Sequence, residues 1–204
     1  MATDNLRHEY ATLFPSAITA LIGAGTEKFV AKSLVLKRAE KRSDFFLMSK
    51  SGKRVILIEV QGYLDEWLRH RMLATMALFC LQHRFRGQME AAIIFLTEAQ
   101  RKASENFHRQ FRGISRLRFA PRVIVLQRLQ VQALQRTNNI LLAPLYSLCD
   151  ITPREIKQRA RAWGKQIRGA SPLPREARSN LLTLLGATIT HRIKNIKADE
   201  VSEL

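Results

Sequence analysis

Cysteine is nearly absent from this chain of 204 residues, which contains only Cys80 and Cys149. Each lies in an apolar stretch, so we expect reduced core thiols in a cytosolic protein and no disulfide framework. Long apolar runs are also lacking. The longest, such as 72–81 and 140–148, are too short to cross a bilayer, and the polar first nine residues do not resemble a secretory signal. A soluble protein without membrane contact is expected.

Acidic residues are half as frequent as basic ones. The chain has 17 Asp and Glu against 34 Lys and Arg, a formal net charge of +17 and a pI near 10.9. A field of this sign attracts a polyanion, because binding releases the counterions condensed on its phosphates. A generally basic protein and an anionic membrane surface are alternative readings. Arginine is spread along the whole chain rather than gathered in one amphipathic helix, which favours nucleic acid.

The order of apolar patterns predicts an α/β fold. Strands are expected at 29–36, 44–49, 54–61, 91–96 and 122–126, with helices between and around them at 5–22, 65–84, 98–111 and 128–136. The Lys-Ser-Gly-Lys turn at 50–53 predicts a hairpin, so the central β-sheet should be mixed and flanked by helices. After residue 150 the chain becomes basic and helical, and Thr152 with Pro153 marks a helix start. We therefore expect a core at 1–150 and a helical C-terminal extension at 151–204.

Two carboxylates at the predicted hairpin, Asp44 and Glu59, are the candidates for a catalytic metal site. Side chains alternate between the faces of a strand, so Glu59 and Gln61 should project to the same side. Pairing within the hairpin would bring Asp44 close to them. Two carboxylates at a strand end suit Mg²⁺ or Mn²⁺, which can polarise a phosphate and activate water. The alternative is that Glu59 caps a strand at the surface and Asp44 begins a turn.

Three short motifs carry a resemblance to a known family. The stretches R-S-D-F-F at 42–46, I-E-V-Q-G at 58–62 and R-M-L at 71–73 resemble the recombination-promoting nuclease (putative transposase) family of the PD-(D/E)XK superfamily. The likeness covers residues 4 to about 165, with its sharp motifs confined to 42–73. It implies a restriction-endonuclease-like core and a Mg²⁺-dependent DNA endonuclease, linked to recombination or mobile elements and working at the bacterial nucleoid.

The resemblance also implies roles for single residues. Asp44 and Glu59 would bind the metal, and Gln61 stands where the superfamily has a lysine, so a hydrogen-bonding amide replaces a positive charge. The first helix would add an acid, either Glu9 or Asp4. Arg71 matches a family position after the metal site; a salt bridge to Asp65 or Glu66 is its alternative role. The residues expected to contact DNA are Arg42, Arg71, Arg84 and Arg86.

Three further alternatives follow from these patterns. The missing lysine at 61 is compatible with a nuclease-like protein that binds nucleic acid without cutting it. The pI alone would also fit a basic RNA-associated protein. Many nucleases of this superfamily pair to cut both strands, so a homodimer is expected as one arrangement. Its interface would use the apolar face of the last helix, formed by Leu181, Leu182, Leu184, Leu185 and Ile189.

Overall fold

The protein is described by a computed structural model at residues 10, 13–25, 27–32, 45–105 and 119–193. These residues form two compact units. The sheet unit contains the described residues from Leu13 to Val125, and the helical unit contains Tyr10 and the described residues from Leu126 onward. The chain thus divides at Leu126, ahead of the functional division that the sequence predicts at residue 150.

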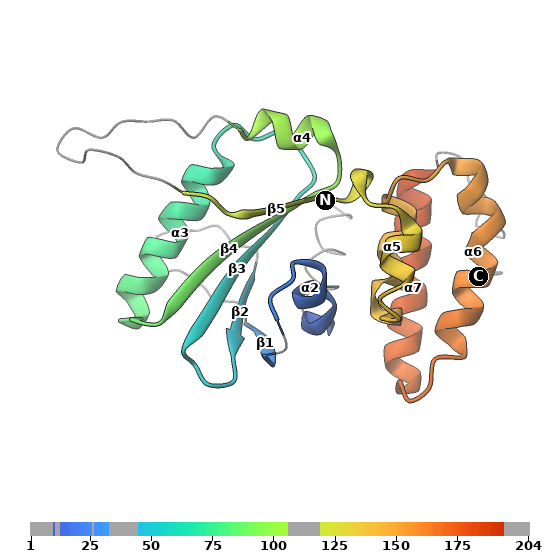
Figure 1. Ribbon diagram of the computed structural model, residues 1–204, viewed down its shortest axis with the longest axis horizontal. Coiled ribbons are helices and arrows are strands. Elements are labelled where there is room, and N and C mark those ends of the chain that lie inside the picture. Colours follow the sequence, from blue (N-terminus) through green and yellow to red (C-terminus); the bar gives the residue numbers. More distant parts are fainter. Residues whose placement is uncertain (1–9, 11–12, 26, 33–44, 106–118, 194–204) are drawn as a thin grey trace. The chain divides into compact units, whose positions relative to one another are not determined.

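A five-stranded mixed sheet forms the centre of the sheet unit (Figure 1). Its strands follow chain order: β1 (Phe29–Lys32), β2 (Phe45–Ser49), β3 (Arg54–Gln61), β4 (Gln88–Phe95) and β5 (Arg122–Val125). The first three pair antiparallel through the hairpin, whereas β3, β4 and β5 are parallel. The predicted mixed α/β architecture is confirmed at this level.

The longest helix of the sheet unit, α3 (Leu68–His83), covers one face of the sheet (Figure 1). It connects β3 to its parallel neighbour β4, as a parallel pair requires. Alternate strand residues pack against it in one apolar cluster. The fully buried members include Phe46, Leu57 and Phe95 from the strands and Met72 and Phe79 from α3. Phe46 and Phe79 stack with ring centroids 4.6 Å apart.

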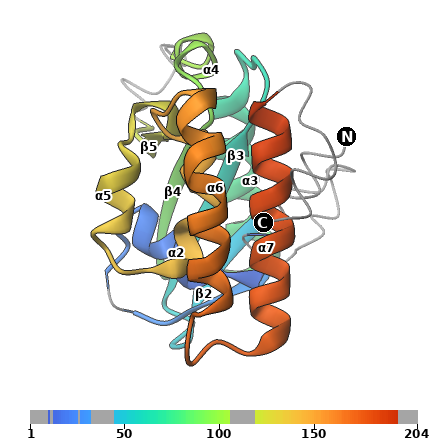
Figure 2. The ribbon, with the colours of Figure 1, turned by 90° about the vertical axis from the view of Figure 1, so that its right-hand side faces the viewer.

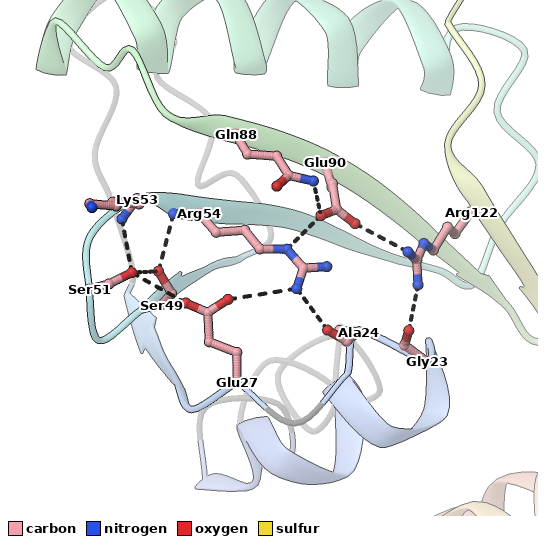
Figure 3. Close-up of polar contacts among 10 residues, drawn as sticks. All are labelled: Gly23, Ala24, Glu27, Ser49, Ser51, Lys53, Arg54, Gln88, Glu90 and Arg122. Carbon is pink, nitrogen blue, oxygen red and sulfur yellow. Dashed lines mark hydrogen bonds and ion pairs between the residues drawn. The ribbon is translucent and has the colours of Figure 1, made fainter.

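The short helix α2 (Pro15–Leu21) lies on the other face of the sheet, and two arginines hold the chain just after it (Figure 3). Arg54 donates to the carbonyl of Ala24 at 2.8 Å, and Arg122 donates to the carbonyl of Gly23 at 2.7 Å. Glu90 on β4 bridges both, 2.6 Å from Arg54 Nε and 3.4 Å from Arg122 Nη2. The arginines therefore satisfy carbonyls of the turn that follows the C-cap of α2.

Most observed elements agree with their expected positions, although their first and last residues differ. The helix predicted at 65–84 begins at Leu68, and β4 begins three residues earlier than expected, at Gln88. Helix α4 (Glu98–Ala103) starts with a capping box between Thr97 and Gln100. It ends at Ala103, before the end of the helix that the sequence predicts. The rest of the segment predicted at 98–111 lies largely outside the described residues.

The helical unit contains η1 (Leu126–Arg128), α5 (Val131–Gln135), η2 (Ile140–Leu148), α6 (Pro153–Arg168) and α7 (Arg175–Arg192). The helices α6 and α7 run side by side and pack on η2 (Figure 2). Its core contains Trp163, whose ring meets Tyr146 edge-on with centroids 5.6 Å apart. The predicted cap of α6 is confirmed, because the Thr152 side chain and Glu155 form a capping box.

The apolar face of α7 is already covered within this unit. Leu181, Leu184, Leu185 and Ile189 are buried, and α7 packs against η2 and α6. Thr188 also donates to the carbonyl of Pro144 at 2.8 Å. This face is therefore not available as the expected dimer interface, and a homodimer stays a prediction. No helix in the described ranges has the length and apolar character needed to cross a membrane.

Candidate active site

The central strand β3 carries two polar side chains at its C-terminal end. Val55 and Leu57 belong to the cluster under α3, so alternation along the strand directs Glu59 and Gln61 to this same face. Both are buried: Glu59 is 7% exposed and Gln61 1% exposed. Burying a carboxylate and an amide costs free energy unless each finds polar partners. The partners of these two side chains therefore define the site.

Arg71 on α3 is the partner of Glu59. Its Nη2 lies 3.3 Å from Glu59 Oε1 and 2.6 Å from Asp65 Oδ2, and its Nε donates to the same Asp65 oxygen at 3.0 Å. One guanidinium thus joins two carboxylates, one from the strand and one from the turn that follows it. The salt bridge of Arg71 to Asp65 that the sequence offered as an alternative is confirmed. The contact with Glu59 brings Arg71 to the candidate site as well.

Gln61 uses its donor and leaves its acceptor open. Nε2 donates to the carbonyl of Tyr63 at 2.7 Å, whereas Oε1 is buried and has no hydrogen-bond partner among the described residues. The Tyr63 carbonyl can only accept, so the amide nitrogen must be the atom that faces it. The oxygen is therefore the atom left for a ligand, a water molecule or an ion.

The turn after β3 presents apolar side chains beside these polar groups. Tyr63, Leu64 and Trp67 are 55%, 66% and 51% exposed. Their backbone is held by the site itself, because Gln61 binds the Tyr63 carbonyl and Asp65 Oδ1 accepts from the Trp67 N–H at 2.8 Å. The same residues that build the polar site thus fix an exposed apolar turn next to it.

A second arginine of α3 adds positive charge. Burial lowers the pKa of the Arg69 guanidinium, an effect that Glu105 opposes and Arg101 increases. A guanidinium has so high an intrinsic pKa that it stays charged at neutral pH. Arg69 and Arg71 therefore place two cations in the first turn of α3, close to the end of the central strand.

The described residues supply part of a site for a hard cation. The Glu59 carboxylate and the Gln61 amide oxygen are both oxygen donors, the type that Mg²⁺ prefers. Within the described ranges, no three His, Cys, Asp or Glu side chains gather in a group that could hold a metal ion. The donor chemistry fits Mg²⁺, and the expected second carboxylate, Asp44, lies outside the described residues.

The structure brings together some of the predicted residues and separates others. Glu59, Gln61 and Arg71 meet at one end of β3. Arg84 and Arg86 are exposed but lie beyond the other end of α3, a helix of 16 residues and roughly 24 Å in length. They cannot act at the same place as Glu59. The predicted residues outside the described ranges are Asp4, Glu9, Arg42 and Asp44.

Sequence reasoning missed the role of the Tyr63 carbonyl and the way in which Gln61 divides its two functions. A backbone acceptor carries no signal in the sequence. The spacing of Gln61 and Tyr63 gives a weak hint, since a side-chain amide can reach a carbonyl two residues later. The sequence also gives no signal that Trp67 lies at the surface, just ahead of the first residue of α3.

Comparison with known proteins adds membership of a family. No curated protein and no solved structure matches the chain. A protein-family model described as "Protein of unknown function (DUF2887)" matches residues 3–204, which is nearly the whole sequence. This description assigns no activity, so a function has to be argued from the site. The chain belongs to the DUF2887 family.

Proposed function

We propose that this protein is a metal-dependent DNA endonuclease with a PD-(D/E)XK-type core. The observation that carries the proposal is the pair at the end of β3: a buried carboxylate, Glu59, and on the same face a buried amide, Gln61, with an open oxygen. Parallel β3 and β4 joined by α3, with an antiparallel hairpin beside them, are compatible with such a core. The net charge of +17 suits a polyanionic substrate.

The proposal gives each residue a task. Glu59 and Asp44 would hold Mg²⁺, with Mn²⁺ as a substitute; when bound, the ion would polarise the scissile phosphate and activate water. The described register pairs Phe45, the residue after Asp44, with Ile58, the residue before Glu59. Arg71 would keep Glu59 ionised and present positive charge toward the phosphate. Glu9, or Asp4 in its place, would contribute a further acid.

Gln61 would position the turn and a ligand rather than neutralise the negative charge of the phosphate. Its amide holds the turn at Tyr63, and its open oxygen is suited to accept from a water molecule or to face a cation. A neutral amide stabilises a developing negative charge less than the superfamily's lysine does. We therefore expect slow cleavage, with Arg71 supplying part of the missing positive charge.

A second candidate function has its own support. Arg71 already pairs with both Glu59 and Asp65 from within the chain, so Glu59 has a cationic partner without a bound ion. With a glutamine at position 61, the same fold would then bind nucleic acid without cutting it, as a recombination or regulatory factor. An RNA-associated protein remains the third alternative, supported by the pI alone.

The first test is nicking of supercoiled plasmid at low salt in Mg²⁺, Mn²⁺ or EDTA, with the wild type, Glu59→Gln and Asp44→Asn. Metal-dependent nicking that both substitutions abolish is the expected result. The matched control is Glu90→Gln, which alters another strand carboxylate bonded to an arginine, on the opposite face of the sheet. It should leave nicking intact once folding is checked by circular dichroism.

Two other outcomes are informative. Equal nicking by the wild type and Glu59→Gln would exclude this centre. Binding of plasmid by the wild type without cleavage in either metal would favour the non-catalytic candidate. In that case Asp44→Asn should bind DNA as tightly as the wild type or more tightly, because it removes a negative charge that a phosphate would meet.

A further inference from the structure

The helix α6 carries a straight row of cations along one side. An α-helix has about 3.6 residues per turn, so residues three or four positions apart point in nearly the same direction. Five basic residues follow such steps and fall within an arc of about 80°. We call this row the α6 stripe: Arg154, Lys157, Arg161, Lys165 and Arg168, all exposed.

The opposite side of α6 is buried. Ile156, Trp163 and Ile167 have at most 1% of their surface exposed. A helix that binds in a membrane interface must insert its apolar face among the lipids. The apolar face of α6 is instead packed in the helical unit, so the stripe can meet a partner through charge alone. This favours a soluble polyanion over a lipid surface.

Acidic residues are few in α6 and in the described part of the helical unit. Glu155 is the single acid of α6, and its carboxylate accepts from the Thr152 N–H and hydroxyl at 3.0 and 2.8 Å. These hydrogen bonds lower the pKa of Glu155. It faces Arg159, at 3.9 Å, and the two residues point about 80° and 120° away from the nearest edge of the stripe. In the described residues from 126 onward, the other acids are Asp150 and Glu176.

The C-terminal end of α6 adds a further cation. Arg178 of α7 donates from Nη1 to the carbonyl of Arg168 at 3.0 Å. A cation at this place is stabilised by the negative end of the helix dipole and is held near the last residue of the stripe. The positive surface therefore continues past the end of α6.

We propose that the α6 stripe binds the phosphate backbone of duplex DNA. From Arg154 to Arg168 it extends about 21 Å, a length along which one strand of a duplex presents about six phosphates. A rigid row of charges complements a rigid duplex, and contacts to phosphates fix the position of the protein without selecting a sequence. The choice of DNA over RNA rests on the proposed function; the anchoring itself does not require cleavage.

The test is binding of a short fluorescent duplex, measured by anisotropy in EDTA over a series of salt concentrations. The stripe variant is Arg161→Gln with Lys165→Gln, which keeps good helix formers while removing two charges. The matched control is Arg136→Gln with Arg159→Gln, which removes the same charge from exposed or half-exposed positions outside the stripe. Thermal unfolding and circular dichroism confirm that both fold.

The stripe variant should bind at least ten-fold more weakly, and the slope of log K against log salt should become shallower by about 1.8. The control should change affinity less than about two-fold, and the charge-preserving pair Arg161→Lys with Lys165→Arg should bind like the wild type. Equal affinity and slope for the stripe variant and its control would overturn the proposal. Tighter stripe-dependent binding to RNA, or to phosphatidylserine vesicles, would overturn duplex DNA as the ligand.

This experiment separates the two proposals. The Glu59→Gln protein, assayed in parallel, should bind at least as tightly as the wild type if the stripe is the anchor, because it keeps the stripe and loses a negative charge. Stripe-dependent binding together with the absence of nicking would leave the anchor standing and refute the endonuclease. Metal-dependent nicking together with normal DNA binding by the stripe variant would support the endonuclease and refute the anchor.

Discussion

The Arg71 guanidinium of α3 meets the buried Glu59 carboxylate of β3 at 3.3 Å, while it binds Asp65 more closely, at 2.6 Å. One cation thus serves two carboxylates and lies 34% exposed. A divalent ion at Glu59 would have to share this carboxylate with Arg71 or displace it toward Asp65. Under the proposed function, this relationship would link the stability of the sheet unit to metal binding.

The first prediction concerns the removal of this cation. Arg71→Met leaves Glu59 buried without its described partner, and in EDTA the variant should lose about 1–2 kcal/mol of unfolding free energy. The value lies below that of a fully buried pair because Arg71 is partly exposed to water. Added Mg²⁺ should stabilise the variant more than the wild type, since the ion replaces the missing charge. Urea unfolding in EDTA and in Mg²⁺ measures both effects.

Two variants check the interpretation. Arg86→Met changes an exposed arginine beyond the far end of α3 and should alter stability by less than about 0.5 kcal/mol. Glu59→Gln combined with Arg71→Met should be more stable than Arg71→Met alone, because no unpaired carboxylate remains. If Arg71→Met were as stable as the wild type in EDTA and insensitive to Mg²⁺, Glu59 would have another partner.

The second prediction concerns position 61. Gln61→Lys retains a donor for the Tyr63 carbonyl and adds the positive charge that the superfamily places there. If the protein nicks DNA, the variant should do so about ten-fold faster, since one well-placed cation stabilises the developing charge on the phosphate. Single-turnover nicking rates at saturating Mg²⁺ measure the change. A slower variant with an intact fold would mean that the open oxygen of Gln61 is the group that matters.

Much of the sheet unit could be predicted because its signals are local. Lys50 to Lys53 form the expected turn between β2 and β3, with Gly52 at a positive φ of 69° that glycine adopts easily. The strand predicted at 54–61 is observed with the same bounds as β3, which has a neighbour on each side. Alternation then predicted that Glu59 and Gln61 share a face, and β3 continues as a regular strand through both residues.

The parts that could not be predicted depend on contacts distant in sequence. Nothing around Glu90 indicates that it bridges Arg54 and Arg122, residues 36 and 32 positions away. Arg84 and Arg86 looked suitable for DNA because of their charge alone. Only the direction of α3, which carries the chain away from Glu59, shows that they belong to another place on the surface. Charge and periodicity fix local structure but not which end of a helix faces a site.

The third prediction concerns Cys149. Burial raises the pKa of its thiol from 9.0 to about 12, with Asp150 adding to the shift. Because only the thiolate is a good nucleophile, iodoacetamide at about pH 8 should modify the half-buried Cys80 and spare Cys149 until the chain is unfolded in urea. A Cys80→Ser protein isolates the signal in peptide mass spectrometry. Rapid alkylation of Cys149 in this folded variant would contradict the buried position.

The same shift has a consequence for stability. The folded chain holds the Cys149 proton more tightly than the unfolded chain, whose thiol titrates near 9.0. The contribution is therefore fully present below this pH and is lost as the pH rises through the pKa of about 12 in the folded state. Cys149→Ala should show a smaller loss of unfolding free energy over that alkaline range than the wild type.

The last prediction separates two acids that bind the same arginine. Glu90 lies 2.6 Å from Arg54 Nε, and both side chains are less than one-fifth exposed, whereas Glu27 lies 3.7 Å from Arg54 Nη1 and is 36% exposed. The hydrogen bond that Arg54 donates to Glu90 is the main cause of the raised pKa of Arg54. Glu90→Gln should thus cost about 2 kcal/mol of unfolding free energy and Glu27→Gln less than about 0.5 kcal/mol. Urea midpoints at equal m-values measure both, and equal losses would show that burial does not decide the strength of this network.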